Sequence, residues 1–444
     1  MVFAGLTFLV FVFPLVTLVH QVLPKKYRNL FLISASLFFY AWGDISYIPL
    51  LLLISAVNYY LGKKIKENKR AKAYLMLGIV LDMGILAYYK YFAFFAEQFF
   101  HMEYSIRLPL GISFFTFQTV SYIIDVYRRD IEAETSLPDY LTYILMFPQL
   151  IAGPIVRYSD IALELKERTL DKSRMEQGMM QFAAGLAAKV LIANNFAIVF
   201  EQANAYTSSF ASLVTMLSIG MQYYFDFAGY SLMAIGMGNM LGFRFPVNFD
   251  LPYSAYSATT FWRRWHITLG TWFREYVYIP LGGNRVSKLR QVFNIMLVWA
   301  LTGFWHGASW NFLVWGLYFG VVMIFEKFVL HRYLKEGRVL SHLYGLFVIF
   351  LGWYFVGYQD LGMAIRKIIA LFSFQTAASD WYVLQFSAVP ILLSIILCIP
   401  RVIHFLEHAA EHTLARTAMT LTLILLSIAS LVSSGYNPFL YFRF

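Results

Sequence analysis

The stretch LVWALTGFWHGASWNFLVWG, from Leu297 to Gly316, is apolar enough to lie in a membrane, yet it contains one histidine, His306. It holds no Asp, Glu, Lys or Arg. An ionisable group inside a membrane is costly, which makes chemistry a reasonable explanation for His306. The competing interpretation is a hydrogen-bonded packing residue, because the small neighbours Gly303, Gly307 and Ala308 allow helices to approach closely.

The composition of the whole chain is that of an integral membrane protein. Of 444 residues, 59% are hydrophobic and only 14% are charged. A soluble domain cannot bury that much apolar surface. The net charge of +10 lies largely in short loops, which makes it a signal of membrane topology and excludes nucleic acid as a partner. The single cysteine, Cys398, excludes an internal disulfide.

These features predict an all-α, polytopic fold with about ten to twelve transmembrane helices, plus re-entrant and interfacial helices. We expect one domain over residues 1–444, with its core motifs in 108–320. The expected apolar segments are 2–23, 30–42, 45–61, 73–100, 108–127, 178–200, 212–241, 292–304, 308–325, 340–356, 383–399 and 417–434.

Basic loops give an orientation to the first segments. Residues 24–28 and the loop KKIKENKRAK, residues 63–72, are rich in Lys and Arg. Short basic loops stay on the cytoplasmic side. We therefore expect both loops inside and the turn at Gly43 and Asp44 outside.

Two segments are not expected to cross the membrane as simple helices. Residues 141–156 are interrupted by Pro148 and Pro154, which suggests a bent or re-entrant segment. Residues 254–283 alternate aromatic and charged side chains, which is typical of an interfacial or re-entrant helix. Residues 159–177 are charged and are expected at the cytoplasmic surface.

His266 is the natural partner for His306, because it follows Arg263-Arg264-Trp265 at the point where this aromatic and basic segment would enter the membrane. Two histidines could meet at one buried site and serve as a general base. Without a nearby Asp, Glu or Cys they would bind a metal poorly, so no metal is expected there. His266 could equally be an interfacial belt residue.

The sequence HFLEHAAEH places His404, His408 and His412 four residues apart. It matches the H-x-x-E-H pattern of some zinc peptidases. The simpler interpretation is a solvated interfacial helix, because the stretch lies between an apolar run and a further span.

Charged side chains around this region have two interpretations each. Asp226, inside the apolar run MQYYFDFAGYS, is expected to be functional or paired with a buried base. Arg263, Arg264 and Arg274 belong to a basic band that either anchors the protein to phospholipid or binds the phosphates of an anionic donor. The remaining members of the band are Arg285, Lys288 and Arg290.

Several motifs resemble those of the membrane-bound O-acyltransferase family. They are FWRRWHITLGTWFREYVYIPLGGNR (261–285), GFWHGASWNFLVWG (303–316), LPLGISFFTFQTVSYIIDVYR (108–128), FPQLIAGPI (147–155) and the ending NPFLYFRF (437–444). Within the family they are most similar to the branch that O-acetylates alginate. The motif FAGYSL (227–232) is closer to the branch that transfers D-alanine toward teichoic acids.

The resemblance implies an activity, a central funnel or tunnel among the helices, and a set of roles. His306 matches the presumed catalytic base of the family and His266 its second active-site position. Arg263, Arg264, Arg274 and Asn311 are expected to bind the donor. The donor would be acetyl-CoA or an acyl carrier protein thioester, delivered from the cytoplasm to a multi-pass protein of the bacterial inner membrane, with no bound cofactor.

The acceptor would be a hydroxyl of an exported polysaccharide, or a partner protein outside the cytoplasm that resembles an acetyltransferase or esterase. Membrane lipid surrounds the protein. Two alternatives remain open at this point. One is D-alanyl transfer from a carrier protein to teichoic acid, and the other is a proton-coupled transporter in which His306, His266 and Asp226 line a path.

Overall fold

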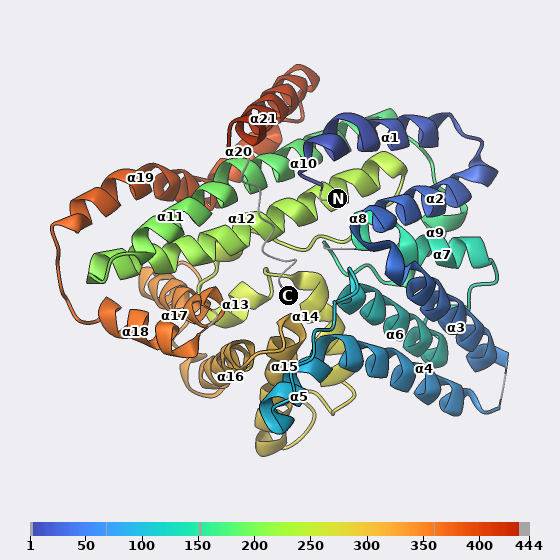
Figure 1. Cartoon of the computed structure of the whole chain (residues 1–444), viewed down its shortest axis with the longest axis horizontal. Helices are drawn as coiled ribbons and strands as arrows, with labels where there is room; N and C mark the ends of the chain where they lie inside the picture. The colour runs from blue at the N-terminus through green and yellow to red at the C-terminus, as the bar shows by residue number, and fades with distance from the viewer. Residues whose placement is uncertain (1–2, 68, 151–152, 359, 435–444) are drawn as a thin grey trace. The chain divides into compact units, whose positions relative to one another are not determined.

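The computed structural model describes residues 3–67, 69–150, 153–358 and 360–434 (Figure 1). These residues form helices and connecting segments, and the only β-pairing among them is an isolated bridge between Phe249 and Trp265. The predicted all-α fold is confirmed. Seven helical stretches in this described part are long and apolar enough to cross a membrane. The count treats Lys25–Glu67 as one stretch of 43 residues, and it leaves out apolar helices shorter than 18 residues, such as residues 8–22 and 112–128.

The contacts of the chain divide it into two compact units, residues 1–182 with 231–247 and residues 183–230 with 248–444. Each unit is described separately. The expectation of one domain over residues 1–444 stays a prediction.

Nine α-helices lie wholly within the first unit, counted over its described residues. They are α1 (Phe13–Val22), α2 (Lys25–Asp44), α3 (Ile48–Glu67), α4 (Ala71–Leu86), α5 (Phe92–Phe100), α6 (Ile112–Arg128), α7 (Leu137–Leu145), α8 (Phe147–Leu150) and α9 (Tyr158–Lys166). The boundary between α2 and α3 falls at Asp44, whose extended backbone breaks the helix and whose carboxylate accepts a hydrogen bond from the Ser46 amide. The turn predicted at Gly43 and Asp44 is therefore present.

Helix α6 is the centre of the first unit. It packs against α3 and α4, which run beside it in Figure 1, and its side chains from Ile112 to Ile123 are buried on every face. The buried Asp82 of α4 accepts hydrogen bonds from Asn58 at 2.9 Å and from Thr119 of α6 at 2.7 Å. The segment expected as a span from 108 to 127 is thus enclosed by protein within this unit, rather than facing lipid.

The segment 141–156 is broken, as predicted. The break falls at Met146, two residues before Pro148, where it was expected. Helix α7 ends before Met146, whose backbone leaves the helical region, and Pro148 lies inside the short helix α8. Proline is tolerated there because the first turn of a helix has no intrahelical partner for its N–H. Pro154 follows residues 151–152, which lie outside the described residues.

The second unit is built on long helices with shorter ones between them. Helix α10 (Lys172–Ala187) passes into it from the first unit, and α12 (Ser209–Leu241) passes out of it. The helices that lie wholly in it are α11 (Asn194–Asn204), α13 (Ala258–Trp262), α14 (Ile267–Phe273), α15 (Lys288–His306), α16 (Trp310–Phe325), α17 (Val339–Gly357), α18 (Leu361–Leu371), α19 (Ser379–Leu397), α20 (Pro400–Ala409) and α21 (Thr413–Ser434). Helix α12 runs for 33 residues without a break. Helix α18 was not predicted.

The segment 254–283 is not a single helix. It consists of α13, α14 and a π-helical turn from Arg274 to Tyr278. The start of α13 is fixed by Glu326, a buried carboxylate that accepts hydrogen bonds from the backbone amides of Ala258 at 2.7 Å and Thr259 at 2.8 Å. A carboxylate at a helix N-terminus satisfies amides that have no intrahelical partner.

The histidine-rich sequence HFLEHAAEH forms α20 and the turn after it, with exposed imidazoles. His404 contacts Glu407 at 3.2 Å, and His408 contacts Glu411 at 3.0 Å. Among the described residues, no three His, Cys, Asp or Glu side chains gather in a way that could hold a metal ion. This arrangement favours the solvated helix over the zinc site. The ending NPFLYFRF lies outside the described residues.

Candidate active site

His306 is the last residue of α15, where that helix turns sharply into α16. Gly307 and Ser309 adopt extended backbone conformations, and α16 begins at Trp310. The two helices are in close contact because Gly303 of α15 faces Gly316 of α16: a Cβ atom on Gly303 would collide with the carbonyl oxygen of Phe312. The packing role expected for the small residues around His306 is therefore real, and it places the imidazole at the end of a rigid hairpin.

His266 is held by a short stretch of extended backbone. The Asp250 amide donates to the Arg264 carbonyl at 2.9 Å, and the Ile267 amide donates to the Asn248 carbonyl at 3.0 Å. Between these two hydrogen bonds, His266 has a left-handed backbone with a φ of 45° and caps α14. Such a conformation is unfavourable for a residue with a side chain and persists only where the surroundings impose it.

Hydrogen bonds define the tautomer of each imidazole. His306 Nδ1 lies 2.7 Å from the carbonyl oxygen of Thr302, which can only accept, so Nδ1 donates. His266 Nδ1 lies 3.0 Å from Asn248 Oδ1, an oxygen that also accepts from the Thr268 hydroxyl at 2.8 Å. In the neutral form of both rings the lone pair is therefore on Nε2.

The two histidines, 40 residues apart in sequence, lie beside one another. Their ring centroids are 6.4 Å apart with planes at 80°. His266 is only 2% exposed, and its ring packs on Phe227 at 4.7 Å. Burial, together with electrostatic interaction with His306, lowers the pKa of His266 well below 6.5, so this imidazole is neutral at pH 7.

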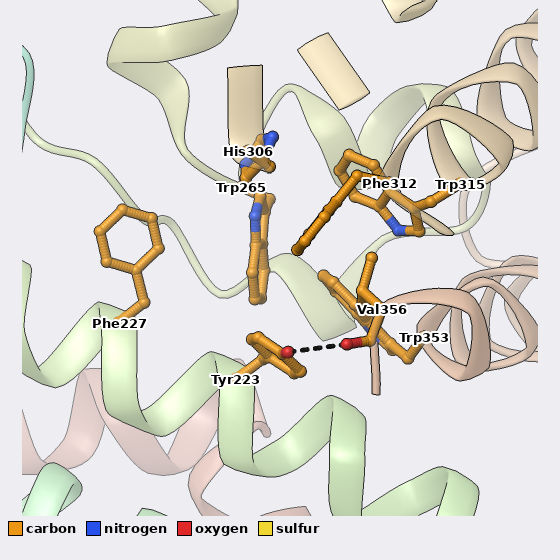
Figure 2. Close-up of a pocket in the computed structure, with 8 residues that line it drawn as sticks. All are labelled: Tyr223, Phe227, Trp265, His306, Phe312, Trp315, Trp353 and Val356. Carbon is orange, nitrogen blue, oxygen red and sulfur yellow. Dashed lines mark hydrogen bonds between the residues drawn. The ribbon is translucent and has the colours of Figure 1, made fainter. Parts of the chain in front are cut away.

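His306 lines a cavity walled by aromatic side chains (Figure 2). The lining residues are Tyr223, Phe227, Trp265, His306, Phe312, Trp315, Trp353 and Val356. The space open to the centre of a water-sized sphere is about 30 Å³, enough for one or two water molecules. His266 is not among the lining residues, although its ring packs on Phe227, so His306 is the histidine that meets the cavity.

The residues expected to bind the donor lie in different surroundings. Arg263 is exposed, Arg264 donates to the Ser254 hydroxyl, and Arg274 pairs with Glu275 at 2.8 Å. Asn311 is buried and donates to the Tyr358 carbonyl at 2.8 Å, which ties α16 to the end of α17. None of the four lines the cavity beside His306.

Asp226 is paired with a buried base, one of the two roles expected for it. Its carboxylate lies 3.0 Å from the Lys189 ammonium, and both side chains are at most 5% exposed. Lys189 also donates to Asn194 at 2.8 Å. Asp226 precedes Phe227 of the cavity wall in α12. The ion pair therefore fixes the part of α12 that packs on His266.

Sequence reasoning missed most of the cavity wall. Tyr223 donates to the Val356 carbonyl at 3.0 Å, the hydrogen bond drawn in Figure 2, and its ring stacks on Trp353 with centroids 5.6 Å apart. Asn248, which orients His266, was also missed. The sequence feature that could have indicated this wall is the density of aromatic residues in 223–227 and 261–265. In 261–265 these residues were interpreted only as one face of an amphipathic helix.

Comparison with known proteins identifies the family to which the chain is similar. The model of the membrane-bound O-acyltransferase family matches residues 128–356. The chain is 34% identical, over the full length of both chains, to a probable alginate O-acetylase of Azotobacter vinelandii. It is 36% identical to a peptidoglycan O-acetyltransferase of Helicobacter pylori, over 77% of this chain and 73% of the relative.

A more distant relative is a teichoic acid D-alanyltransferase of Streptococcus thermophilus. It is 29% identical over 48% of this chain and 56% of its own length. The matched region of the family model contains both histidines and the whole aromatic wall of the cavity. The chain is a multi-pass membrane O-acyltransferase and belongs to the membrane-bound O-acyltransferase family.

Proposed function

We propose that this enzyme transfers an acetyl group from a cytoplasmic thioester, acetyl-CoA or an acyl carrier protein, to a hydroxyl of a cell-surface polysaccharide or of a partner protein that passes it on. The observation that carries the proposal is the arrangement of His306: it meets an apolar cavity, its Nδ1 donates to Thr302, and His266 lies beside it. The names of the alginate and peptidoglycan relatives support acetyl as the group and a polysaccharide as the acceptor.

His306 is proposed as the general base. Its Nε2 removes the proton of the acceptor hydroxyl as the oxygen attacks the thioester carbonyl, and the carbon–sulfur bond then breaks. The proton passes from His306 to the departing thiolate, which leaves as a thiol. A thioester is reactive enough that positioning and one base suffice without a covalent enzyme intermediate.

His266 is proposed to support this step from its buried position beside His306. It remains neutral, because burial lowers its pKa, and so it adds no positive charge that would reduce the basicity of His306. Arg263, Arg264, Arg274 and Asn311 are proposed to bind the donor. The exposed guanidinium groups of Arg263 and Arg274 suit the phosphates of coenzyme A or of a phosphopantetheine arm.

The proposal includes the surroundings of the enzyme. The whole chain acts as one domain in the inner membrane of a bacterium, with the donor arriving from the cytoplasm through a tunnel to His306. The acceptor, or an acetyltransferase-like or esterase-like partner, meets it from the other side. Seven apolar helices in the described residues support the membrane location.

The test is acetyl transfer by the purified protein in detergent, with acetyl-CoA or acetylated carrier protein supplied in separate reactions. We expect His306→Gln to reduce the rate by at least about a hundredfold, the contribution of a positioned base, while its unfolding temperature stays close to that of the parent. The matched control is His408→Gln, since His408 is exposed. Full activity in His306→Gln would rule out the proposed base.

A second candidate is D-alanyl transfer to teichoic acid. The motif FAGYSL and the relative in Streptococcus thermophilus favour it. The identity to that relative covers about half of this chain, against the full length for the alginate relative. Mass spectrometry of the cell-envelope polymers, with and without the protein, separates the two: we expect loss of acetyl esters and no change in D-alanyl esters.

A further inference from the structure

The first unit contains a large pocket that the proposed chemistry does not use. Its lining residues are Lys25, Lys26, Arg28, Asn29, Leu30, Ser136, Pro138, Asp139, Leu165, Lys166 and Arg168. The space open to the centre of a water-sized sphere is about 420 Å³, far more than the cavity beside His306. A polar group the size of a phosphate ester fits into it.

The pocket is strongly cationic. Five of its lining side chains are Lys or Arg and one, Asp139, is a carboxylate. Lys166 is paired with Glu134 at 3.4 Å, and Asp139 accepts a hydrogen bond from Asn29 at 2.6 Å. Among the described residues, Arg28 and Arg168 have no carboxylate within 4.0 Å.

Arg168 is the most informative member of this cluster, because it is only 6% exposed. Its guanidinium donates to the side-chain oxygen of Asn29 and contacts the His20 imidazole at 3.2 Å, both neutral partners. Its Nε has no hydrogen-bond partner in the described structure. Burial, and then the nearby charge of Arg28, lower the pKa of Arg168 to about 10. A buried cation in this state is strongly stabilised by an anion.

The position of the pocket in the chain indicates the kind of anion. It lies at the start of α2, and Lys25 is the first residue of a stretch apolar enough to cross a membrane. Apolar side chains on either side of the pocket are exposed: Val22 by 74% and Leu30 by 51%. Cationic side chains at the end of apolar helices are where lipid headgroups and acyl chains meet a membrane protein.

We propose that this pocket binds the phosphate of an anionic phospholipid headgroup, with Arg168, Arg28 and the two lysines at the start of α2 as its partners. The acyl chains lie along the exposed apolar side chains at the adjoining ends of α1 and α2. The N-terminus of α2 adds amide donors and a positive dipole end. The site is independent of acyl transfer, since it uses no residue of the proposed active site.

The test is native mass spectrometry of the full-length protein in detergent, with equal amounts of phosphatidylglycerol and phosphatidylcholine. We expect the protein to retain phosphatidylglycerol preferentially. The double variant Lys25→Gln/Lys26→Gln should reduce that retention by roughly tenfold, the effect of removing charges close to an anionic headgroup. Lys69→Gln/Lys72→Gln is the matched control, because it removes the same charge from exposed positions outside the pocket.

Arg168→Gln should abolish the preference, and the lysine variant keeps the test valid if Arg168→Gln fails to fold. Equal retention of the two lipids, or equal losses in both double variants, would overturn the proposal. A separate reaction offers inorganic pyrophosphate to lipid-depleted protein. Pyrophosphate binding that phosphatidylglycerol does not displace would identify a soluble phosphate ligand and also overturn the lipid assignment. His306→Gln should retain phosphatidylglycerol fully, which separates this site from the proposed activity.

Discussion

The position of one proton decides what each active-site histidine can do. Both imidazoles donate through Nδ1 to an oxygen, His306 to Thr302 and His266 to Asn248. The basic lone pair is then on Nε2 in both. For His306 the acceptor is a backbone carbonyl of its own helix, which side-chain substitutions cannot remove. For His266 the acceptor is a side chain, and it can be tested.

Asn248→Ala should lower kcat by roughly tenfold or more, because the substitution removes the oxygen that holds the ring of His266. Asn248→Asp keeps an acceptor at that position and should restore much of the rate. The measurement is kcat as a function of pH for both variants. A purely structural role for Asn248 would lower the unfolding temperature equally in both and would give the two substitutions the same rate.

The buried His266 should also make stability depend on pH. Its pKa is lowered in the folded protein by burial and by His306, whereas in the unfolded chain it is about 6.5. The unfolded state therefore binds more protons as pH falls below about 6.5, and the stability contributed by the neutral ring is lost on acidification. We expect the unfolding temperature in detergent to fall less between pH 7 and pH 5 in His266→Gln than in the parent. An equal fall in both proteins would contradict this account.

At the scale of elements, the contact between α15 and α16 positions the proposed base. Gly316 faces the carbonyl oxygen of Trp299, and a Cβ atom there would collide with it. The backbones of α15 and α16 are in direct contact here, with no side chain between them. A shift of either helix would therefore move His306. The small residues and the histidine are therefore parts of one arrangement, rather than competing explanations of the same stretch.

Gly316→Ala should destabilise the protein by about 1–3 kcal/mol, the cost of overpacking a tight interface, and should reduce acetyl transfer as well. The control is Gly84→Ala in α4, where a Cβ atom would meet nothing within 4 Å. That substitution should leave the protein equally or more stable, because alanine favours a helix over glycine. Thermal unfolding and transfer rate are measured for both variants. Equal behaviour of the two would show that the α15–α16 contact is not tight.

Sequence reasoning located the apolar helices but not their breaks or their neighbours. Hydropathy predicted α16, α17, α19 and α21 to within four residues, because a membrane helix is identified by length and apolarity alone. Helix α3 extends six residues past its predicted end at residue 61, to Glu67. Hydropathy did not predict α18, which is 11 residues long. It also could not show that α6 is enclosed by protein, since a buried helix and a lipid-facing helix have the same apolar composition.

The same limit applies to the candidate site. Histidines in an apolar setting are conspicuous, and the sequence alone predicts both His266 and His306 as site residues. Asn248 lies in the irregular stretch VNFDLPY, and nothing in that sequence indicates that its backbone pairs with residues 264–267. Contacts between residues distant in sequence arise from the tertiary fold, and a one-dimensional pattern does not contain them.

At the scale of the whole molecule, the distribution of positive charge determines which way the chain crosses the membrane. The net charge is +10, and basic residues are concentrated at 24–28 and 63–72. In the first unit the first group lies at the start of α2 and the second begins in the last turns of α3, with the break at Asp44 between the two helices. Helices α2 and α3 are 20 residues each, or roughly 30 Å of helix. Each is long enough to cross a bilayer, which would return the chain to the side where it began.

This arrangement predicts that residues near 69 lie in the cytoplasm and those near 46 outside it. The chain has one cysteine, Cys398, so Cys398→Ser gives a background free of thiols. In that background Ser46→Cys and Lys69→Cys each place one thiol at an exposed position. A membrane-impermeant maleimide should label Ser46→Cys in sealed right-side-out vesicles, and Lys69→Cys only in inverted vesicles or after detergent is added. Labelling of Lys69→Cys from the outside would reverse the orientation. If Ser46→Cys were then labelled only from the inside, α2 and α3 would still both cross, and the cationic pocket at Lys25 would lie at the outer leaflet.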